Sequence, residues 1–453
     1  MNDKNLMITG SPAKRIISFA LPLMLGNFFQ QLYNTADSLI VGNFLGSNAL
    51  AAVSSAGNLI FLMIGFFQGV SAGAGVVIAH FLGAQDPQRT HKAVHTTVAV
   101  GIIAGLFLMV FGVLCTPWIL ELMHTPAEVM PDSVAYFRNY FYGALGVVLY
   151  NTFVGILQAS GDSKHPLYFL IVSSVTNVVL DLVFIVGLDM GAGAAGLATA
   201  ISQVLSACLC LHRLMVDGGS VSVHLADVGI DFPTLRRILV NGLPSGLQNS
   251  IIAISNVLIQ SSINSLGPAM MSGMGTYAKI EGFAFLPITS FTMAITTYIS
   301  QNLGAGEKRR ARDGARFGVR ICCICAEVIG IFIFVFAPTF IAAFDQTPAV
   351  IEIGTLKSRY TVMFYFMLAF SHAISAVMRG AGRSVIPMGV MLVCWCILRV
   401  TILEVCLKGF GYTNIIYFIH PLTWSLSTLV FSQFYIGFLK RNSCEECRDA
   451  VAN

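Results

Sequence analysis

Four stretches of this chain recur, in the same order, 221 or 222 residues further along. The matching pairs are Leu21–Pro22 with Leu243–Pro244, Leu82–Ala84 with Leu303–Ala305, Thr125–Pro126 with Thr347–Pro348, and residues 158–166 with residues 379–387. One such match would carry no weight, but four at a nearly constant offset predict a duplicated unit. The fold must therefore contain two similar halves joined end to end.

Composition places the duplicated chain in a membrane. Of its residues 56% are hydrophobic and 11% are charged, whereas a soluble domain carries about 25% charged residues. Most of its apolar stretches reach the ~20 residues of a spanning helix. They lie at 16–41, 49–80, 93–117, 136–158, 167–188, 194–216, 238–266, 270–302, 318–344, 360–380, 386–408 and 414–439. We predict an all-α integral membrane protein with twelve transmembrane helices in two pseudo-symmetric six-helix lobes, a design common in secondary transporters.

The polar stretch between the sixth and seventh apolar segments divides the chain. We predict an N-terminal lobe at 1–217, a cytoplasmic linker at 218–231, a C-terminal lobe at 232–441 and a cytoplasmic tail at 442–453. No cleavable signal peptide is expected, because the first apolar segment is long and has no small-residue cleavage site.

Basic residues set the predicted orientation, because loops rich in Lys and Arg stay in the cytoplasm. With the N-terminus inside, twenty Lys and Arg residues fall on the inner side and four in outer loops: Arg138, Lys357, Arg359 and Lys408. Both termini are therefore expected in the cytoplasm.

The nucleotide-binding and metal-binding motifs of soluble proteins are not supported by the sequence around them. Residues 191–196 match the G-x-G-x-x-G fingerprint but follow a long apolar run instead of a short strand, so we expect a tight turn and close helix packing there. No G-x-x-x-x-G-K-[ST] loop is present, so this chain is not expected to use ATP directly. Its nine histidines are scattered and predict no metal-ligand cluster. Cys444 and Cys447 have no second pair, so they are interpreted as part of the tail.

Ionisable side chains at membrane depth are costly and usually face a cavity or a partner. In this chain they are Asp37, Asp181, Lys279, Glu281, Arg399 and Glu404. Asp37 shares a helix face with Tyr33 and Gln30, beside Asn34. Lipid would leave this polar stripe unsatisfied, so it must point into the protein.

A second polar stripe is predicted on the fifth helix, where Asn177 and Asp181 are four residues apart and Ser174 is a turn earlier. Similar spacing links Thr199, Gln203 and Ser206 on the sixth helix, and Asn151 with Gln158 on the fourth. We expect a pocket with two carboxylates in the N-terminal lobe. In low dielectric such a pair holds a proton or captures a cation. Packing alone explains the serines, but it is a costly explanation for two unpaired acids.

The other ionisable groups have weaker interpretations. Lys279 and Glu281 are two residues apart and do not face each other; Glu281 is expected to line the cavity, and Lys279 to snorkel or pair elsewhere. Arg399 and Glu404 fit a structural charge pair as well as a functional one. The positions 221 residues after Asp37 and Asp181 hold no acid, so the acid pair belongs to one lobe only.

The chain resembles the multidrug and toxic compound extrusion (MATE) family over nearly its whole length. The resemblance rests on the two six-helix lobes, the run Phe19–Pro22 and the run Gln30–Asp37. It is strongest to the bacterial branch with an acid on the first helix, Asn-x-x-x-Asp on the fifth and Thr on the sixth. Asp37, Asn177, Asp181 and Thr199 stand at those places.

The resemblance implies a secondary antiporter of the bacterial cytoplasmic membrane. Such a protein exports amphiphilic, often cationic organic compounds in exchange for H⁺ or Na⁺ by alternating access. The four residues above would couple transport, with Na⁺ a candidate ligand of the two aspartates. Pro22, which removes a helical hydrogen bond, is the expected hinge. Residues expected to line the substrate cavity are Gln30, Tyr33, Asn34, Asn151, Gln203, Gln248, Asn256 and Glu281.

Further expectations follow from the same resemblance. The partners are small amphiphilic substrates and membrane lipids, with no nucleic acid, no enzymatic activity and no cofactor besides the coupling ion; a monomer is expected. Residues 364–378 contain no carboxylate, so the sodium site that another branch builds in its C-terminal lobe is not expected here.

Three alternatives remain at this point. A flippase or exporter of lipid-linked or metabolite substrates could use the same fold, although such proteins tend to have extra helices and a basic cavity. A channel needs a ring or constriction, which two unequal repeats fit poorly. A membrane enzyme has no motif in its favour.

Overall fold

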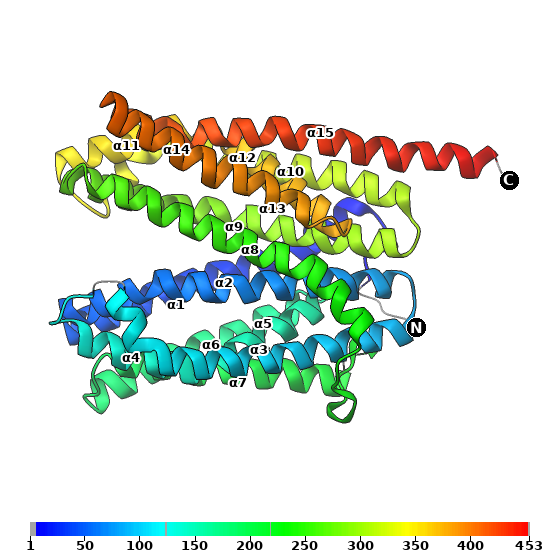
Figure 1. The fold of residues 1–453 in the computed structure, drawn as a ribbon, viewed down its shortest axis with the longest axis horizontal. Helices are drawn as coiled ribbons and strands as arrows, with labels where there is room; N and C mark the ends of the chain where they lie inside the picture. Colours follow the sequence, from blue (N-terminus) through cyan, green and yellow to red (C-terminus); the bar gives the residue numbers. More distant parts are fainter. Residues whose placement is uncertain (1–5, 123–124, 218, 452–453) are drawn as a thin grey trace. The chain divides into compact units, whose positions relative to one another are not determined.

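The computed structural model describes residues 6–122, 125–217 and 219–451, and every regular element in these ranges is helical. The helices (Figure 1) are α1 Pro12–Leu45, α2 Ser47–Gly83, α3 Pro87–Leu122, α4 Met130–Tyr142, α5 Ala144–Ala159, α6 Lys164–Asp181, α7 Gly193–Asp217, α8 Phe232–Asn264, α9 Pro268–Gly304, α10 Lys308–Ala342, α11 Pro348–Val362, α12 Tyr365–Gly380, α13 Val385–Met391, α14 Arg399–Glu404 and α15 Ile415–Val451. Three π-helical segments continue these helices at Leu182–Gly187, Leu392–Leu398 and Val405–Gly409.

The helices confirm the predicted membrane fold. Within the described ranges, nine helical spans are long and apolar enough to cross a membrane, and the pairs α4–α5 and α11–α12 supply two more. Helix α8, 33 residues long, occupies the remaining predicted stretch. The predicted tail at 442–453 begins inside α15, whose backbone remains helical to Val451. The side chains of Cys444 and Cys447 lie outside the described ones.

Two of the predicted spans, 136–158 and 360–380, are each formed by two helices that meet at a bend, at equivalent points of the repeat. The pair α4–α5 bends by 47° after Tyr142, and α11–α12 bends by 54° after Val362. At the first bend, Gly143 lies so close to Ala200 of α7 that a Cβ on it would clash. Both pairs also begin earlier than the apolar stretches at 136–158 and 360–380, at Met130 and Pro348.

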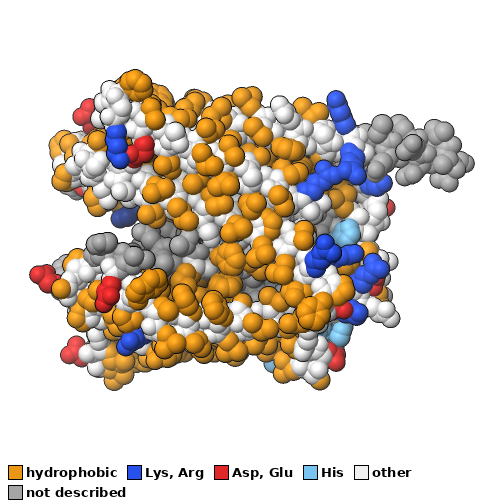
Figure 2. Space-filling model, in the orientation of Figure 1, with side chains coloured by type: hydrophobic (Ala, Val, Ile, Leu, Met, Phe, Trp, Pro, Cys, Tyr) orange, Lys and Arg blue, Asp and Glu red, His pale blue; other side chains and the backbone are white. Residues whose placement is uncertain are grey.

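Lipid-facing helices show large exposed apolar side chains. Phe107, Leu114 and Trp118 of α3 are 62%, 72% and 62% exposed, which in water would form an unusually apolar patch. On the face drawn in Figure 2, hydrophobic side chains cover the middle of each unit, and Lys, Arg, Asp and Glu lie toward the helix ends. This banding is what a hydrocarbon layer requires.

The chain forms two compact units whose boundaries pass through helices instead of loops. The N-terminal unit contains Leu25–Gly246, and the C-terminal unit contains Met7–Met24 and the chain from Leu247 onward. The boundaries differ from the predicted 217/218 and 231/232 because α1 and α8 each contribute to both units. Met24 and Gly246 stand at the repeat offset, and Pro22 and Pro244 each lie two residues before a boundary.

In the N-terminal unit, α2 and the first half of α8 meet backbone to backbone. Gly69 and Gly73 of α2 lie against Gly246 and Gly242 of α8, and a Cβ on Gly69 would be 2.5 Å from the Cα of Gly246. Both helices therefore present G-x-x-x-G, the spacing that lets membrane helices pack most closely.

The equivalent contact in the C-terminal unit is made by side chains. Ile16 and Ala20 of α1 belong to the same apolar core as Phe291 and Ile295 of α9. The repeat therefore keeps the topology and changes the packing, since glycines in one unit correspond to apolar side chains in the other.

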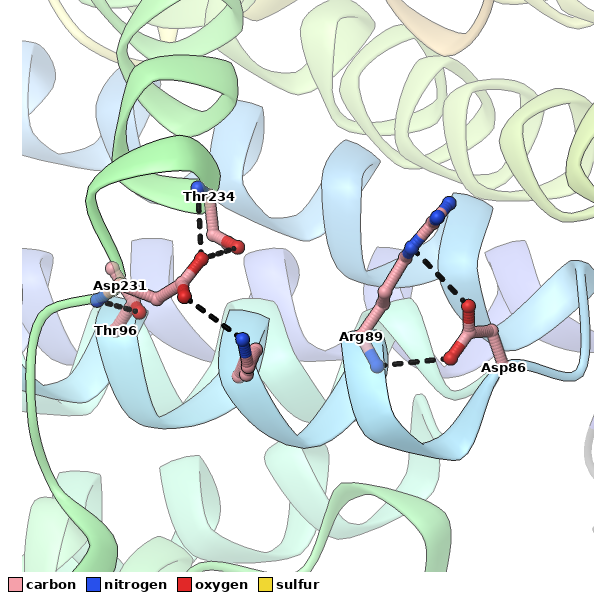
Figure 3. A network of polar contacts seen from close by, with 6 residues as sticks. Asp86, Arg89, Thr96, Asp231 and Thr234 are labelled. Carbon is pink, nitrogen blue, oxygen red and sulfur yellow. Dashed lines mark hydrogen bonds and ion pairs between the residues drawn. The ribbon is translucent and has the colours of Figure 1, made fainter.

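The linker between α7 and α8 is docked on α3 by a polar network (Figure 3). The Asp231 carboxylate accepts from Lys92 Nζ at 3.1 Å and from the backbone N–H and hydroxyl of Thr234, and its own N–H donates to Thr96 Oγ1. The hydrogen bond from the Thr234 side chain, followed by that from Lys92, lowers the pKa of Asp231. Within the same view, Asp86 caps the first turn of α3 and pairs with Arg89.

We expect Gly73→Ala to destabilise the protein, because the added methyl group would overlap the α8 backbone. The expected loss is about 1–3 kcal/mol, the usual cost of overpacking. The matched control is Gly275→Ala on α9, whose Cβ position is open. Thermal unfolding of detergent-purified protein measures both; equal midpoints for the two variants would contradict the proposed close contact.

Candidate ion-coupling site

Two carboxyl groups meet inside the N-terminal unit. Asp181 ends α6 and is 0% exposed, and Asp37 reaches it from the second half of α1. The two carboxyl groups lie within hydrogen-bonding reach of each other. Asp37 Oδ1 and both Asp181 oxygens are buried without a donor among the described residues, because two carboxylates can only accept. Such a pair requires a proton on one group or a cation between them.

Asn177 joins the acids to α7. It lies one turn before Asp181 and is 1% exposed, and its Nδ2 donates to Thr199 Oγ1 at 3.3 Å. Its Oδ1 is buried and accepts no hydrogen bond in the described part of the chain. This oxygen and the carboxylate oxygens give the site the ligand type that hard cations prefer. The four residues predicted to couple transport thus lie in one neighbourhood.

A break in helical regularity follows the site directly. Asp181 is the last α-helical residue of its span, and Leu182–Gly187 is π-helical, with Leu188 N–H donating to Val183 O at 2.9 Å. Single π turns inside α-helices frequently mark functional sites. The apolar sequence of this segment gave no signal for the break.

Tyrosines surround the acid pair, and sequence analysis identified only one of them. Tyr33 hydrogen-bonds to Gln30 one turn earlier and lies within electrostatic range of both acids. Tyr136 of α4 is 6% exposed and lies close enough to interact with Asp37, with Tyr140 one turn further along and a ring separation of 6.3 Å. Their i, i+4 spacing was the available signal.

Helix α4 is held near the site by the glycines that resemble a dinucleotide fingerprint. A Cβ on Gly196 would be 2.5 Å from Tyr136 O, and one on Gly193 would be 2.9 Å from Asn139 Nδ2. Asn139 Nδ2 also donates to Gly193 O at 2.8 Å. The predicted role in close helix packing is confirmed.

The residues predicted to line a cavity divide between the two units. In the N-terminal unit, Gln30 and Asn34 are exposed, Gln203 is buried, and Asn151 donates to Val147 O of its own helix. In the C-terminal unit, Asn256 is exposed, but Gln248 is 2% exposed and donates to Met391 Sδ at 2.9 Å. Gln248 is therefore part of the packed interior instead of an open wall.

The C-terminal unit buries its own charged residues with partners. Glu281 accepts from Tyr277 Oη at 2.8 Å, and Arg399 is 3% exposed and donates to Thr423 Oγ1 at 3.0 Å. Glu404 accepts from Ser262 and pairs with Lys408. Lys279 is exposed and lies over the Phe344 ring.

The prediction that Lys357 lies in an outer loop is wrong. It belongs to α11 and is 2% exposed, and its Nζ donates to Ile416 O at 3.0 Å and contacts His420 Nδ1 at 3.2 Å. Helix α11 starts at Pro348, so the lysine is carried into the unit, where helix carbonyl groups and a histidine replace water.

Comparisons with known proteins agree with the duplicated membrane fold. The MatE family model matches residues 22–183 and 244–403, two copies at the repeat offset. The chain is 30% identical over 380 residues to "Probable multidrug resistance protein YoeA" of Bacillus subtilis, covering 82% of this chain and 81% of that protein. It is 27% identical to "Probable multidrug resistance protein YpnP" of the same organism, covering 86% and 87%. Its fold is similar to that of an outward-facing multidrug resistance MATE transporter of the MOP superfamily, with 22% identity, a TM-score of 0.90 and 98% of each chain covered.

We expect Asp181→Asn to stabilise the protein by about 1–3 kcal/mol in alkaline solution, where the pair loses its shared proton, because the amide can still donate to Asp37 whereas two carboxylates cannot. Thermal unfolding without Na⁺, compared between neutral and alkaline pH, is the measurement. Glu121→Gln, an exposed acid at the end of α3, is the control and should change little. A clearly lower unfolding temperature for Asp181→Asn than for the wild type would mean that the Asp181 carboxyl group stabilises the packing of the helices.

Proposed function

Because the chain belongs to the MATE family of membrane transporters, we propose that it is a secondary antiporter that exports amphiphilic, often cationic organic compounds in exchange for H⁺ or Na⁺. The family and the names of the relatives support a multidrug exporter without enzymatic activity. One observation carries the coupling mechanism: half-buried Asp37 and fully buried Asp181 meet, and three of their carboxyl oxygens are buried without a hydrogen-bond donor among the described residues.

The acid pair supplies the energy coupling in this proposal. A proton or Na⁺ bound between Asp37 and Asp181 removes their repulsion, and release of the ion restores it. The bound and free forms therefore favour different packings of α1 against α6. An ion shifts a conformational equilibrium only if it binds the two conformations with different affinity. The acid pair provides this difference in affinity, because the repulsion between its two carboxylates must be neutralised by a bound ion.

Asn177 and Thr199 position the site. Their hydrogen bond ties α6 to α7 and leaves the buried amide oxygen of Asn177 without a donor among the described residues. Asn177 and Asp181 are four residues apart and share a helix face. Na⁺ would use this oxygen as a further ligand, whereas a proton needs only the two carboxyl groups. These residues therefore fit both H⁺ and Na⁺, and transport driven by a pH gradient or by a Na⁺ gradient distinguishes the two ions.

Pro22 is the proposed hinge of α1. It lies inside the helix and removes one backbone hydrogen bond, two residues before the point where α1 passes from one compact unit to the other. Pro244 occupies the equivalent point of α8. Bending at these prolines is the movement that alternating access requires.

We infer the orientation from the charges. Twenty Lys and Arg residues fall on one predicted side of the membrane and few on the other, which supports cytoplasmic termini. A reporter enzyme that is active only in the cytoplasm should therefore be active when fused to either end.

Uptake of a cationic dye into everted membrane vesicles tests the function. We expect uptake driven by an imposed pH gradient or by a Na⁺ gradient, and the effective gradient identifies the ion. Asp37→Asn and Asp181→Asn should each reduce driven uptake to the level of vesicles without the protein, because the amides cannot carry the exchanged ion. Glu121→Gln is the matched control and should keep wild-type uptake.

Two results would contradict the proposal. Unchanged dye uptake in both aspartate variants would mean that Asp37 and Asp181 contribute to helix packing and do not couple ion movement to transport. Absence of gradient-driven uptake for every cationic dye tested would favour a lipid-linked or metabolite substrate on the same fold.

A further inference from the structure

A second cluster of polar groups lies in the N-terminal unit, where the linker crosses the start of α3. His91 and His95 come from α3, and Asp227 comes from the short helical turn Leu225–Asp227 of the linker. One potential ligand atom from each of the three lies within 4.8 Å of the others, and His91 Nε2 is 3.2 Å from Asp227 Oδ2. The sequence predicts no metal-ligand cluster among the histidines, but the structure brings two of them together with an acid. Histidines four residues apart share a helix face, and this signal was overlooked.

The hydrogen bonds of His95 hold its imidazole ring in the orientation and tautomer that are common for a metal-binding histidine. His95 Nδ1 lies 2.8 Å from the carbonyl oxygen of His91, which can only accept, so Nδ1 carries the hydrogen. Nε2 is then the nitrogen with a free electron pair, and it accepts from the backbone N–H of His224 at 3.0 Å. A backbone carbonyl that orients the second nitrogen is the common support of a ligating imidazole.

We propose that His91, His95 and Asp227 form a binding site for a divalent transition-metal ion of the zinc type. Two imidazoles and one carboxylate suit Zn²⁺, Cu²⁺ or Ni²⁺ and not Mg²⁺ or Ca²⁺, which prefer oxygen ligands throughout. The three side chains leave one position of a tetrahedral zinc for water. His95 exchanges the His224 N–H for the metal. His224 remains adjacent, its ring 6.3 Å from both the other imidazoles.

The solvent exposure of the ligand side chains and the pairing of the nearby lysine both favour binding of a cation from solution. The side chains of His91 and Asp227 are 45% and 50% exposed, whereas His95 is 2% exposed and forms the floor of the site. The ion can therefore enter at His91 and Asp227 without an opening of the helices. The neighbouring Lys92 cation is already engaged by Asp231.

The linker is held in place before the metal arrives. Asp231 binds Lys92 and Thr96 of α3, each of which directly follows one of the two histidines in the chain. Because hydrogen bonds from Thr234 and Lys92 lower the pKa of Asp231, its carboxylate keeps this docking as the pH falls and loses it only in stronger acid than a free aspartate would require. The docked linker therefore already holds Asp227 beside His91, and binding has to replace only the hydrogen bond between His95 and His224. The metal adds a second tie between the linker and α3, directly before α8 begins at Phe232.

Zn²⁺ titration of the full-length protein, purified in detergent with any affinity-tag histidines removed, tests the proposal. Calorimetry should show one tight Zn²⁺ per chain at pH 7.5. His91→Ala and Asp227→Asn should each weaken binding by more than the about 10–100-fold that loss of an outer-shell partner costs. Affinity should also fall as the solution is made acidic, because protons compete with the metal for the ligand atoms. His212→Ala, an exposed histidine of α7, is the matched control and should bind as the wild type does.

A structural readout separates metal binding from a merely structural latch. Zn²⁺ should slow amide hydrogen exchange of residues 219–231 in the wild type and in His212→Ala, and should have no effect in His91→Ala. Gel filtration of each variant confirms that it is folded. Equal Zn²⁺ affinity in His91→Ala and the wild type, or exchange rates in the wild type that do not respond to Zn²⁺, would overturn the proposal.

Discussion

The contact between α2 and the first half of α8 is the constraint on which the N-terminal unit depends. Four glycines allow the two backbones to touch, so the first helix of the second repeat becomes part of the first unit. The linker that precedes α8 must then return to this unit, which brings Asp231 onto α3 beside Lys92. The same return places Asp227 opposite His91. A packing contact without side chains thus determines where polar groups far apart in the chain meet.

The two repeats treat buried charge differently. In the C-terminal unit, Lys357 and Arg399 are buried but hydrogen-bonded to backbone or hydroxyl groups, and Glu281 accepts from a tyrosine. In the N-terminal unit, Asp37 and Asp181 face each other with oxygens that have no donor in the described chain. An isolated buried carboxylate is costly unless a counter-ion or proton joins it. The N-terminal unit is therefore the one in which binding or release of an exchanged ion can change the energy of a buried acid pair.

Much of this arrangement could be predicted from the sequence, because membrane helices must be long and apolar and helix faces repeat every few residues. The twelve spans, the offset of the repeat and the shared face of Asn177 and Asp181 follow from those two rules. Other features could not be predicted. The burial of Lys357 depends on helix carbonyl groups and His420, partners that no local pattern indicates. The π-helical turn after Asp181 depends on packing around an apolar segment that resembles its neighbours.

The sequence by itself determined the fold class, the duplication and the identity of the acids, because hydrophobicity and helical periodicity are local properties that can be recognised directly in the order of the residues. Only the tertiary structure decided which groups meet. It brought Asp37 to Asp181, Tyr136 to that pair, and His91 to Asp227, in each case through helix crossings set by glycine contacts and side-chain volume. Distances between residues a hundred positions apart depend on such packing, and packing energies are properties of the assembled chain.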